Sequence, residues 1–139
     1  MIVMRTVDPK FEFLRSLEVL ADLPDRQLRD LAFRVDEVEL PVGETLIHEG
    51  QLNRHAYFVG SGLLEIDVDG HSVATVGAGS IVGERSAIER ELANATVTVV
   101  APARVFAVDH RVLLGAASLT EAFGDHLQDL AAERTNRAA

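Results

Sequence analysis

The 139-residue sequence contains no cysteine, no tryptophan and only one tyrosine. Without cysteine the chain can form no disulfide and no cysteine metal site, and it offers no thiolate nucleophile. The same absence is typical of a reducing compartment, so we expect a cytoplasmic protein. Thiol catalysis and disulfide-stapled folds are therefore excluded.

Long apolar runs and an excess of positive charge are also absent. No uninterrupted apolar stretch approaches the ~18–20 residues of a membrane span. Residues 1–8 include Arg5 and Asp8 where a secretory signal needs an apolar run, and we expect them to form a flexible terminus. The formal net charge is −9, which disfavours duplex DNA because its phosphates would be repelled. We expect no membrane span and no DNA binding.

The composition that remains is that of one globular domain. Hydrophobic residues make up 47% and charged residues 25% of the chain, which argues against disorder. Apolar residues at helical spacing predict helices within residues 9–35, with Leu14 and Leu17 on one stripe and Leu28 and Leu31 on the next. Within residues 109–139 we expect two further helices, the last opening at Thr120.

The period of the apolar residues changes to two between residues 36 and 108. Leu64, Ile66 and Val68 alternate with acidic residues, and Asp69-Gly70 is the favoured two-residue turn of a β-hairpin. Seven or eight short strands separated by turn residues predict a sandwich or barrel. The segments expected to be separate strands include residues 45–49, 56–59, 64–68, 96–100 and 104–108.

A glycine-rich stretch, residues 79–97, lies between two of these strands. At Gly83 the backbone can turn tightly and approach a ligand, because no Cβ blocks the way. Glu84 follows directly, and Ser86-Ala87 suits the start of a helical turn whose free N–H groups attract an anion. A carboxylate beside an anion site can accept hydrogen bonds from hydroxyl groups of the same ligand. On these residues alone, a glycine-rich turn with a solvated acid is the simpler interpretation.

Short motifs spread over about residues 11–115 resemble the cyclic nucleotide-binding domain family, with residues 79–97 in place of its phosphate-binding cassette. The resemblance implies a mainly β fold, an eight-stranded β-roll (double-stranded β-helix, jelly-roll-like) over residues 36–108 between N- and C-terminal α-helices. It also implies a bound cyclic nucleotide, cAMP or cGMP, and no catalysis. The motifs are, in order, Gly43-Glu44, Glu49-Gly50, Tyr57-Phe58-Val59, Gly62, Gly79, Gly83-Glu84 and Ala95-Thr96-Val97.

The resemblance further implies the residues that contact the nucleotide. Glu84 would accept the ribose 2′-hydroxyl, and the backbone N–H groups of Ser86 and Ala87 would hold the phosphate. Phe123 and Leu127 of the last helix are either core residues or a lid over the base. The predicted ligand-binding residues are Gly83, Glu84, Arg85, Ser86, Ala87, Ala93, Asn94, Ala95 and Thr96.

Two positions depart from the family pattern. Ala93 stands where the family has an arginine that grips the cyclic phosphate, and Val82 replaces an aromatic residue. A hydrogen bond to a charged group contributes ~1.5–3 kcal/mol, and each ~1.4 kcal/mol is tenfold in affinity. We therefore expect binding to be weaker by roughly ten- to a hundredfold or more. Arg85 and Arg90 are either solvated surface residues or compensating cations.

Two functions of different classes remain open. The first is a cAMP-binding regulatory module without catalytic activity, which acts on an effector protein or a second copy through its terminal helices. The second is a degenerate module that binds no nucleotide and serves protein interaction, an interpretation that Ala93 motivates. Hydrolase chemistry is not indicated because no Gly-x-Ser-x-Gly motif occurs. The five histidines form no closely spaced pair, so no metal or metal cofactor is expected.

Overall fold

The computed structural model describes residues 9–89, 91–118 and 125. Several expectations lie outside these residues. They are the flexible terminus at residues 1–8, the side chain of Arg90, and the final helix from Thr120 with Phe123 and Leu127.

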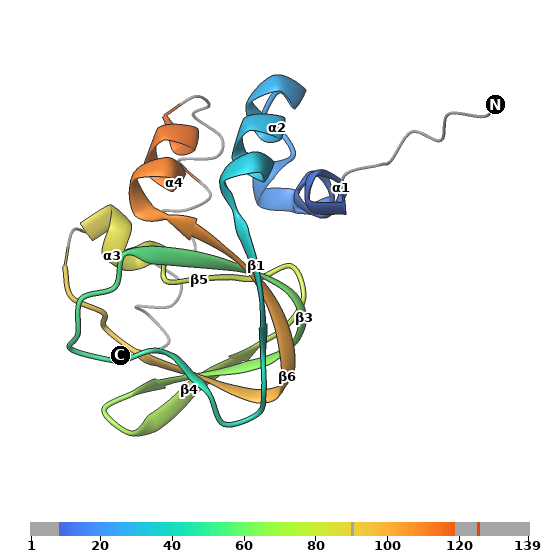
Figure 1. The fold of residues 1–139 in the computed structure, drawn as a ribbon. Coiled ribbons are helices and arrows are strands. Elements are labelled where there is room, and N and C mark those ends of the chain that lie inside the picture. Colours follow the sequence, from blue (N-terminus) through green and yellow to red (C-terminus); the bar gives the residue numbers. More distant parts are fainter. Residues whose placement is uncertain (1–8, 90, 119–124, 126–139) are drawn as a thin grey trace.

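Helices flank the sheet at both ends of the described chain (Figure 1). The N-terminal ones are α1 (Pro9–Ser16), the short 3-10 helix η1 (Glu18–Leu20) and α2 (Asp25–Arg34), and α4 (His110–Ala117) follows the sheet. Helix α2 begins directly after Pro24 and buries one apolar face, as its periodicity predicted. None of the described helices is both long and apolar enough to cross a bilayer.

The sheet consists entirely of antiparallel pairs and is strongly curved (Figure 1). Its strand order is β1-β6-β3-β4, while β2 also pairs with β6 and β5 with β3. The predicted hairpin between β3 and β4 turns at Asp69 and Gly70, which both have positive φ, as a type I′ turn requires. The strands are β1 (Asp36–Leu40), β2 (Thr45–Ile47), β3 (His55–Val68), β4 (His71–Val76), β5 (Ile81–Val82) and β6 (Thr96–Asp109).

The mainly β fold with flanking helices is confirmed, whereas the expected count of eight strands is not. Residues 56–59 and 64–68 belong to the one strand β3, and residues 96–100 and 104–108 belong to β6. Both strands bend while they stay paired, with shifts of register between Val59 and Leu64. At this bend Gly62 has φ +87°, and a Cβ on it would lie 2.3 Å from the carbonyl oxygen of Pro102. The glycine therefore permits a bend and a close strand contact, and does not end the strand.

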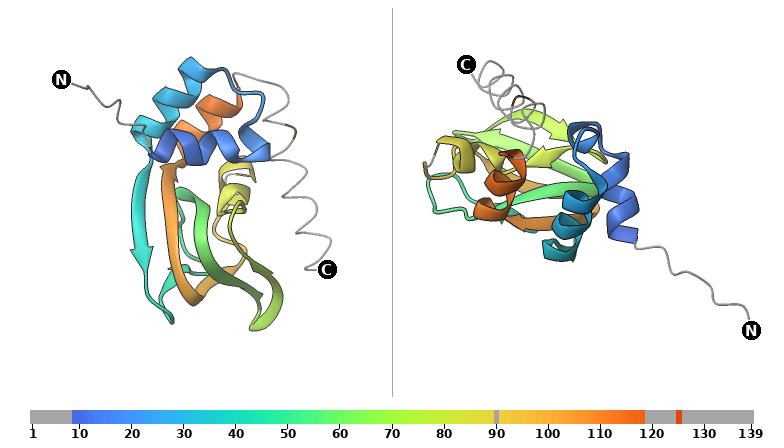
Figure 2. Two further views of the ribbon diagram at one scale, coloured as in Figure 1. Left: turned by 90° about the vertical axis from the view of Figure 1, so that its right-hand side faces the viewer. Right: turned by 90° about the horizontal axis from the view of Figure 1, so that it is seen from above.

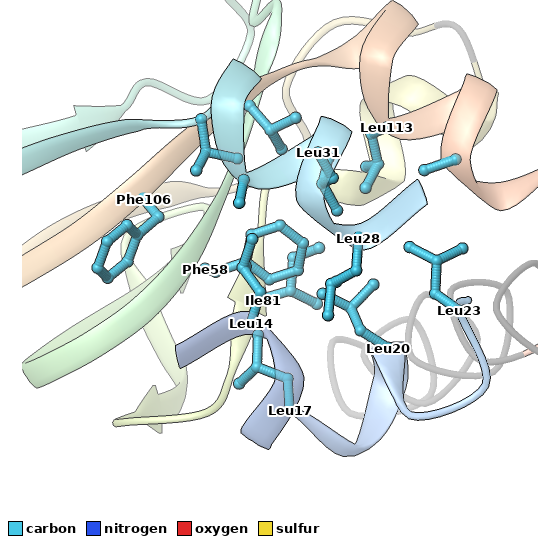
Figure 3. Packing of buried hydrophobic residues seen from close by; sticks show 14 of the residues in the cluster. Leu14, Leu17, Leu20, Leu23, Leu28, Leu31, Phe58, Ile81, Phe106 and Leu113 are labelled. Atoms are coloured by element: carbon cyan, nitrogen blue, oxygen red, sulfur yellow. The ribbon is translucent and has the colours of Figure 1, made fainter. Parts of the chain in front are cut away.

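One hydrophobic cluster joins the helices to the sheet. Figure 2 shows in two views that α1, α2 and α4 gather at the same end of the strands. Their buried side chains meet residues from β3, β5 and β6 (Figure 3). The large residues of this cluster are Leu14, Leu17, Leu20, Leu23, Leu28, Leu31, Phe58, Ile81, Phe106 and Leu113.

A second cluster fills the inside of the curved sheet and supports the glycine-rich stretch. Val82, Ala93 and Val97 from residues 79–97 belong to it. Between them lies the short helix α3 (Glu84–Glu89). The stretch is thus anchored at both ends in a packed core. The other members are Leu40, Ile47, Val59, Leu64, Ile66, Val99, Ala103 and Val105.

The cluster between helices and sheet predicts that two phenylalanines contribute very differently to the free energy of unfolding. Phe58 is 0% exposed and Phe33 is 86% exposed. We expect Phe58→Ala to lower the free energy of unfolding by about 3–5 kcal/mol, and the matched control Phe33→Ala to change it by less than about 0.5 kcal/mol. Urea unfolding of both variants measures this, and equal losses would contradict the packing described.

Candidate functional site

Gly83 fixes the geometry at the start of α3. Its φ is +81°, a conformation that side-chain-bearing residues rarely adopt. A Cβ at this position would lie 2.6 Å from the carbonyl oxygen of His55 and 3.0 Å from Nδ2 of Asn53. The site therefore requires glycine for both its backbone conformation and its close approach to the loop before β3.

Glu84 is the first residue of α3 and is 0% exposed. A carboxylate in such a place is costly unless polar partners surround it. The interpretation of a solvated acid at this turn is therefore wrong. The turn at Gly83 therefore places the carboxylate of Glu84 inside the protein.

A narrow cavity of about 50 Å³, open to solvent at one end, lies beside α3. Most of its wall is aliphatic, from Ile47, Ile66, Val68, Val73, Ala74, Val82 and Val97. The other residues of the wall come from the glycine-rich stretch, and all six of them were predicted to bind the ligand. They are Gly83, Arg85, Ser86, Ala93, Asn94 and Ala95. An apolar pocket with a few polar groups at one side is typical of a small-molecule site.

Ser86 connects the cavity to a residue that the sequence did not indicate. The hydroxyl of Ser86 is buried and lies 3.5 Å from Nδ2 of Asn53, which can donate to it. The same amide donates to the carbonyl oxygen of His55 at 2.8 Å. Asn53 lies between the predicted strands at residues 45–49 and 56–59, and no spacing in the sequence relates it to residues 83–86.

Ala93 is buried, and its backbone is held on both sides. Its N–H donates to the carbonyl oxygen of Gln51 at 2.9 Å, and its own carbonyl accepts from the N–H of Gly50 at 2.7 Å. The side chain belongs to the inner cluster and lines the cavity. A methyl group thus forms the wall at the position where the resemblance expects an arginine.

The family model of the cyclic nucleotide-binding domain matches residues 37–118. The chain belongs to the cyclic nucleotide-binding domain family. The match covers the whole sheet from its second residue, as well as α3 and α4. It agrees with the resemblance inferred from the sequence motifs.

Solved structures of low sequence identity share this fold. The cAMP-bound PfPKA-R, residues 141–441, has a TM-score of 0.84 at 16% identity, over 91% of this chain and 44% of that one. The regulatory subunit of a cAMP-independent protein kinase A from Trypanosoma brucei has a TM-score of 0.82 at 19% identity, over 89% of this chain and 46% of that one. At these identities the likeness establishes the fold.

Curated relatives are longer than this chain. Uncharacterized NTE family proteins of Mycobacterium tuberculosis and Mycobacterium bovis are 33% identical over 76 residues, which is 54% of this chain and 13% of theirs. The chain thus spans a small part of the curated relatives that it matches.

Two predicted residues of the cyclic nucleotide-binding domain do not line the cavity. One is the buried Glu84, and the other is Thr96, whose hydroxyl accepts a hydrogen bond from the N–H of Glu49 at 3.1 Å. Glu49 in turn accepts from the N–H of Asp69 at 2.9 Å. Thr96 therefore joins β6 to the loop after β2. Ala87, the last of the predicted residues, lies within α3.

His110 joins α4 to the cassette of the cyclic nucleotide-binding domain. Its imidazole Nε2 lies 2.9 Å from the carbonyl oxygen of Gly83. Its backbone N–H donates to the carbonyl oxygen of Arg54 at 2.8 Å. Asp109 caps the helix, as predicted, by accepting from the N–H of Arg111 at 2.7 Å. The first residue of α4 is thereby held on the turn that begins α3.

Burial lowers the pKa of His110. The hydrogen bonds to the backbone of Gly83 and His55 and the charge of Asp109 act in the opposite direction, and the nearby His55 adds to the lowering. The net result is a pKa below the ordinary value of 6.5. The partly buried contact between α4 and the cassette therefore favours the neutral form of the His110 imidazole.

This lowered pKa predicts that stability rises with pH. The folded protein binds fewer protons here than the unfolded chain, so the stabilisation is complete above the ordinary pKa and is lost as the pH falls through the lowered one. We expect His110→Gln to flatten the dependence of unfolding free energy on pH below the ordinary histidine pKa of 6.5. Urea unfolding at several pH values measures this.

The control for this prediction is His71→Gln, since His71 is exposed in the β3–β4 hairpin. It should leave the pH dependence as it is in the unaltered protein. Equal slopes for His110→Gln and the unaltered protein would contradict a role for this imidazole.

Proposed function

We propose that the protein is a regulatory module that binds a cyclic purine nucleotide, with cAMP as the first candidate, and catalyses no reaction itself. The observation that carries the proposal is the convergence of six predicted cassette residues on one cavity. Membership of the family supports the ligand class. We also propose a cytoplasmic location for the module.

The residues in and beside the cavity include a candidate partner for each part of such a ligand. The aliphatic wall suits the faces of a purine, because it removes apolar surface from water. Ser86 and Ala87, at the start of α3, supply backbone N–H groups for the phosphate. Glu84 would accept the ribose hydroxyl, and because it is buried outside the cavity wall, its neighbours must move for the sugar to reach it.

The change that follows binding would pass to α4. Gly83 lines the cavity, and its carbonyl oxygen holds His110 of α4. Any ligand that favours one position of this turn therefore biases the helix. The recipient would be an effector protein, a second copy, or another part of a longer polypeptide like the curated relatives.

Titration with cAMP and with cGMP tests the proposal. We expect amide resonances within residues 83–97 to shift at up to millimolar ligand, because several residues of this stretch line the cavity. Two-dimensional NMR of the uniformly labelled protein measures the shifts. No perturbation of residues 83–97 by either nucleotide at millimolar concentration would sink the proposal.

Ala93→Arg is expected to raise the affinity for cAMP at least about tenfold, since a hydrogen bond to a charged group contributes ~1.5–3 kcal/mol. Calorimetric titration of the variant and of the unaltered protein measures the gain. Ala93→Gln is the matched control, because it adds a long side chain without charge. Equal affinities for Ala93→Arg and Ala93→Gln would show that no phosphate is held beside residue 93.

The alternative proposal is a protein-interaction module that binds no nucleotide. Ala93 favours it, and the relative from Trypanosoma brucei is a regulatory subunit described as cAMP-independent. The exposed side chains of Phe33, Leu52 and Leu92 would then be candidates for contact with another protein. A concentration-dependent dimer in sedimentation experiments, together with no nucleotide response, would support this alternative.

A further inference from the structure

We infer that Arg85 supplies the positive charge for the cyclic phosphate in place of the arginine expected at position 93. The inference rests on the proposed function, because it concerns the same cavity and the same class of ligand. Among the described residues that line the cavity, Arg85 is the one charged side chain. The interpretation of Arg85 as a solvated surface residue does not account for this position.

The two positions lie on different segments around the same space. Arg85 belongs to the first turn of α3, and its side chain is only partly exposed. Ala93 lies after α3 and lines the cavity with a methyl group. Arginine at both positions would place two like charges in a confined space.

A guanidinium group suits this role chemically. Its planar set of N–H donors can bind two phosphate oxygens at once, which makes Arg a better match than Lys. Apolar surroundings weaken the screening of a charge pair, and the cavity wall is largely aliphatic. The charge of the guanidinium group also opposes the repulsion of an anion by a chain whose net charge is −9.

The test compares cAMP with adenosine, which shares the base and the ribose but carries no phosphate. We expect Arg85→Gln to weaken cAMP binding at least about tenfold and to leave adenosine binding unchanged. Arg85→Lys should fall between, because it keeps the charge but not the paired donors. Calorimetric titration gives both affinities for each variant. Arg54→Gln is the matched control, since Arg54 is exposed and lies outside this cavity.

A second variant examines whether the two positions are exchangeable. In Arg85→Gln/Ala93→Arg the guanidinium comes from the other segment, and we expect cAMP affinity to return to at least that of the unaltered protein. The gain from Ala93→Arg should be larger in the Arg85→Gln background than alone, because like charges no longer compete.

Three outcomes overturn the inference, and they are distinguishable. If the unaltered protein binds neither cAMP nor cGMP, the proposed function fails and the inference fails with it. If it binds cAMP and Arg85→Gln binds equally well, only the inference fails. If Arg85→Gln weakens cAMP and adenosine alike, Arg85 acts on the nucleoside or on the fold, and a urea unfolding curve of the same variant separates these two causes.

Discussion

The close packing of Gly83 against the start of β3 and the loop before it is the constraint on which the site depends. The residue has positive φ, and the carbonyl oxygen of His55 occupies the place of a side chain. On its other side the imidazole of His110 meets its carbonyl oxygen. Together these contacts fix where α3 begins, and so they determine that Glu84 is buried and that Arg85 borders the cavity. A shift of this turn therefore changes both the cavity and the attachment of α4.

The two hydrophobic clusters explain how a change at the cavity can reach the helices. Successive side chains of a strand point to opposite faces. Phe58 accordingly belongs to the cluster under the helices and Val59 to the cluster beneath the cavity, and the same holds for Ile81 and Val82. One layer of backbone thus separates the cluster under the helices from the cluster beneath the cavity. In the proposed function, a movement of β5 with the turn at residue 83 would change the surface on which α1, α2 and α4 pack.

Local patterns in the sequence predicted the parts of this fold that depend on local chemistry. The helical stripe of α2, the Asp69-Gly70 hairpin and the cap at Asp109 follow from spacing and from residue type. The length of β3 was not predictable, because Gly62 in the sequence looks like an ordinary turn residue. Only its close contact with the carbonyl oxygen of Pro102 in the structure shows that it permits a bend within the strand. The glycine-rich stretch marked most of the cavity. The contacts of Asn53 and His110 were missed because residues distant in sequence make them.

The central claim is that a ligand bound in the cavity changes the conformation or stability of α4 through the turn at residue 83. Hydrogen–deuterium exchange with and without saturating cAMP tests it most directly, because it reports both places in one experiment. The account predicts slower exchange at residues 83–86 together with a changed rate at residues 110–114. Unchanged exchange at both segments would contradict the claim, and protection of residues 83–86 alone would leave a binding site without the coupling described here.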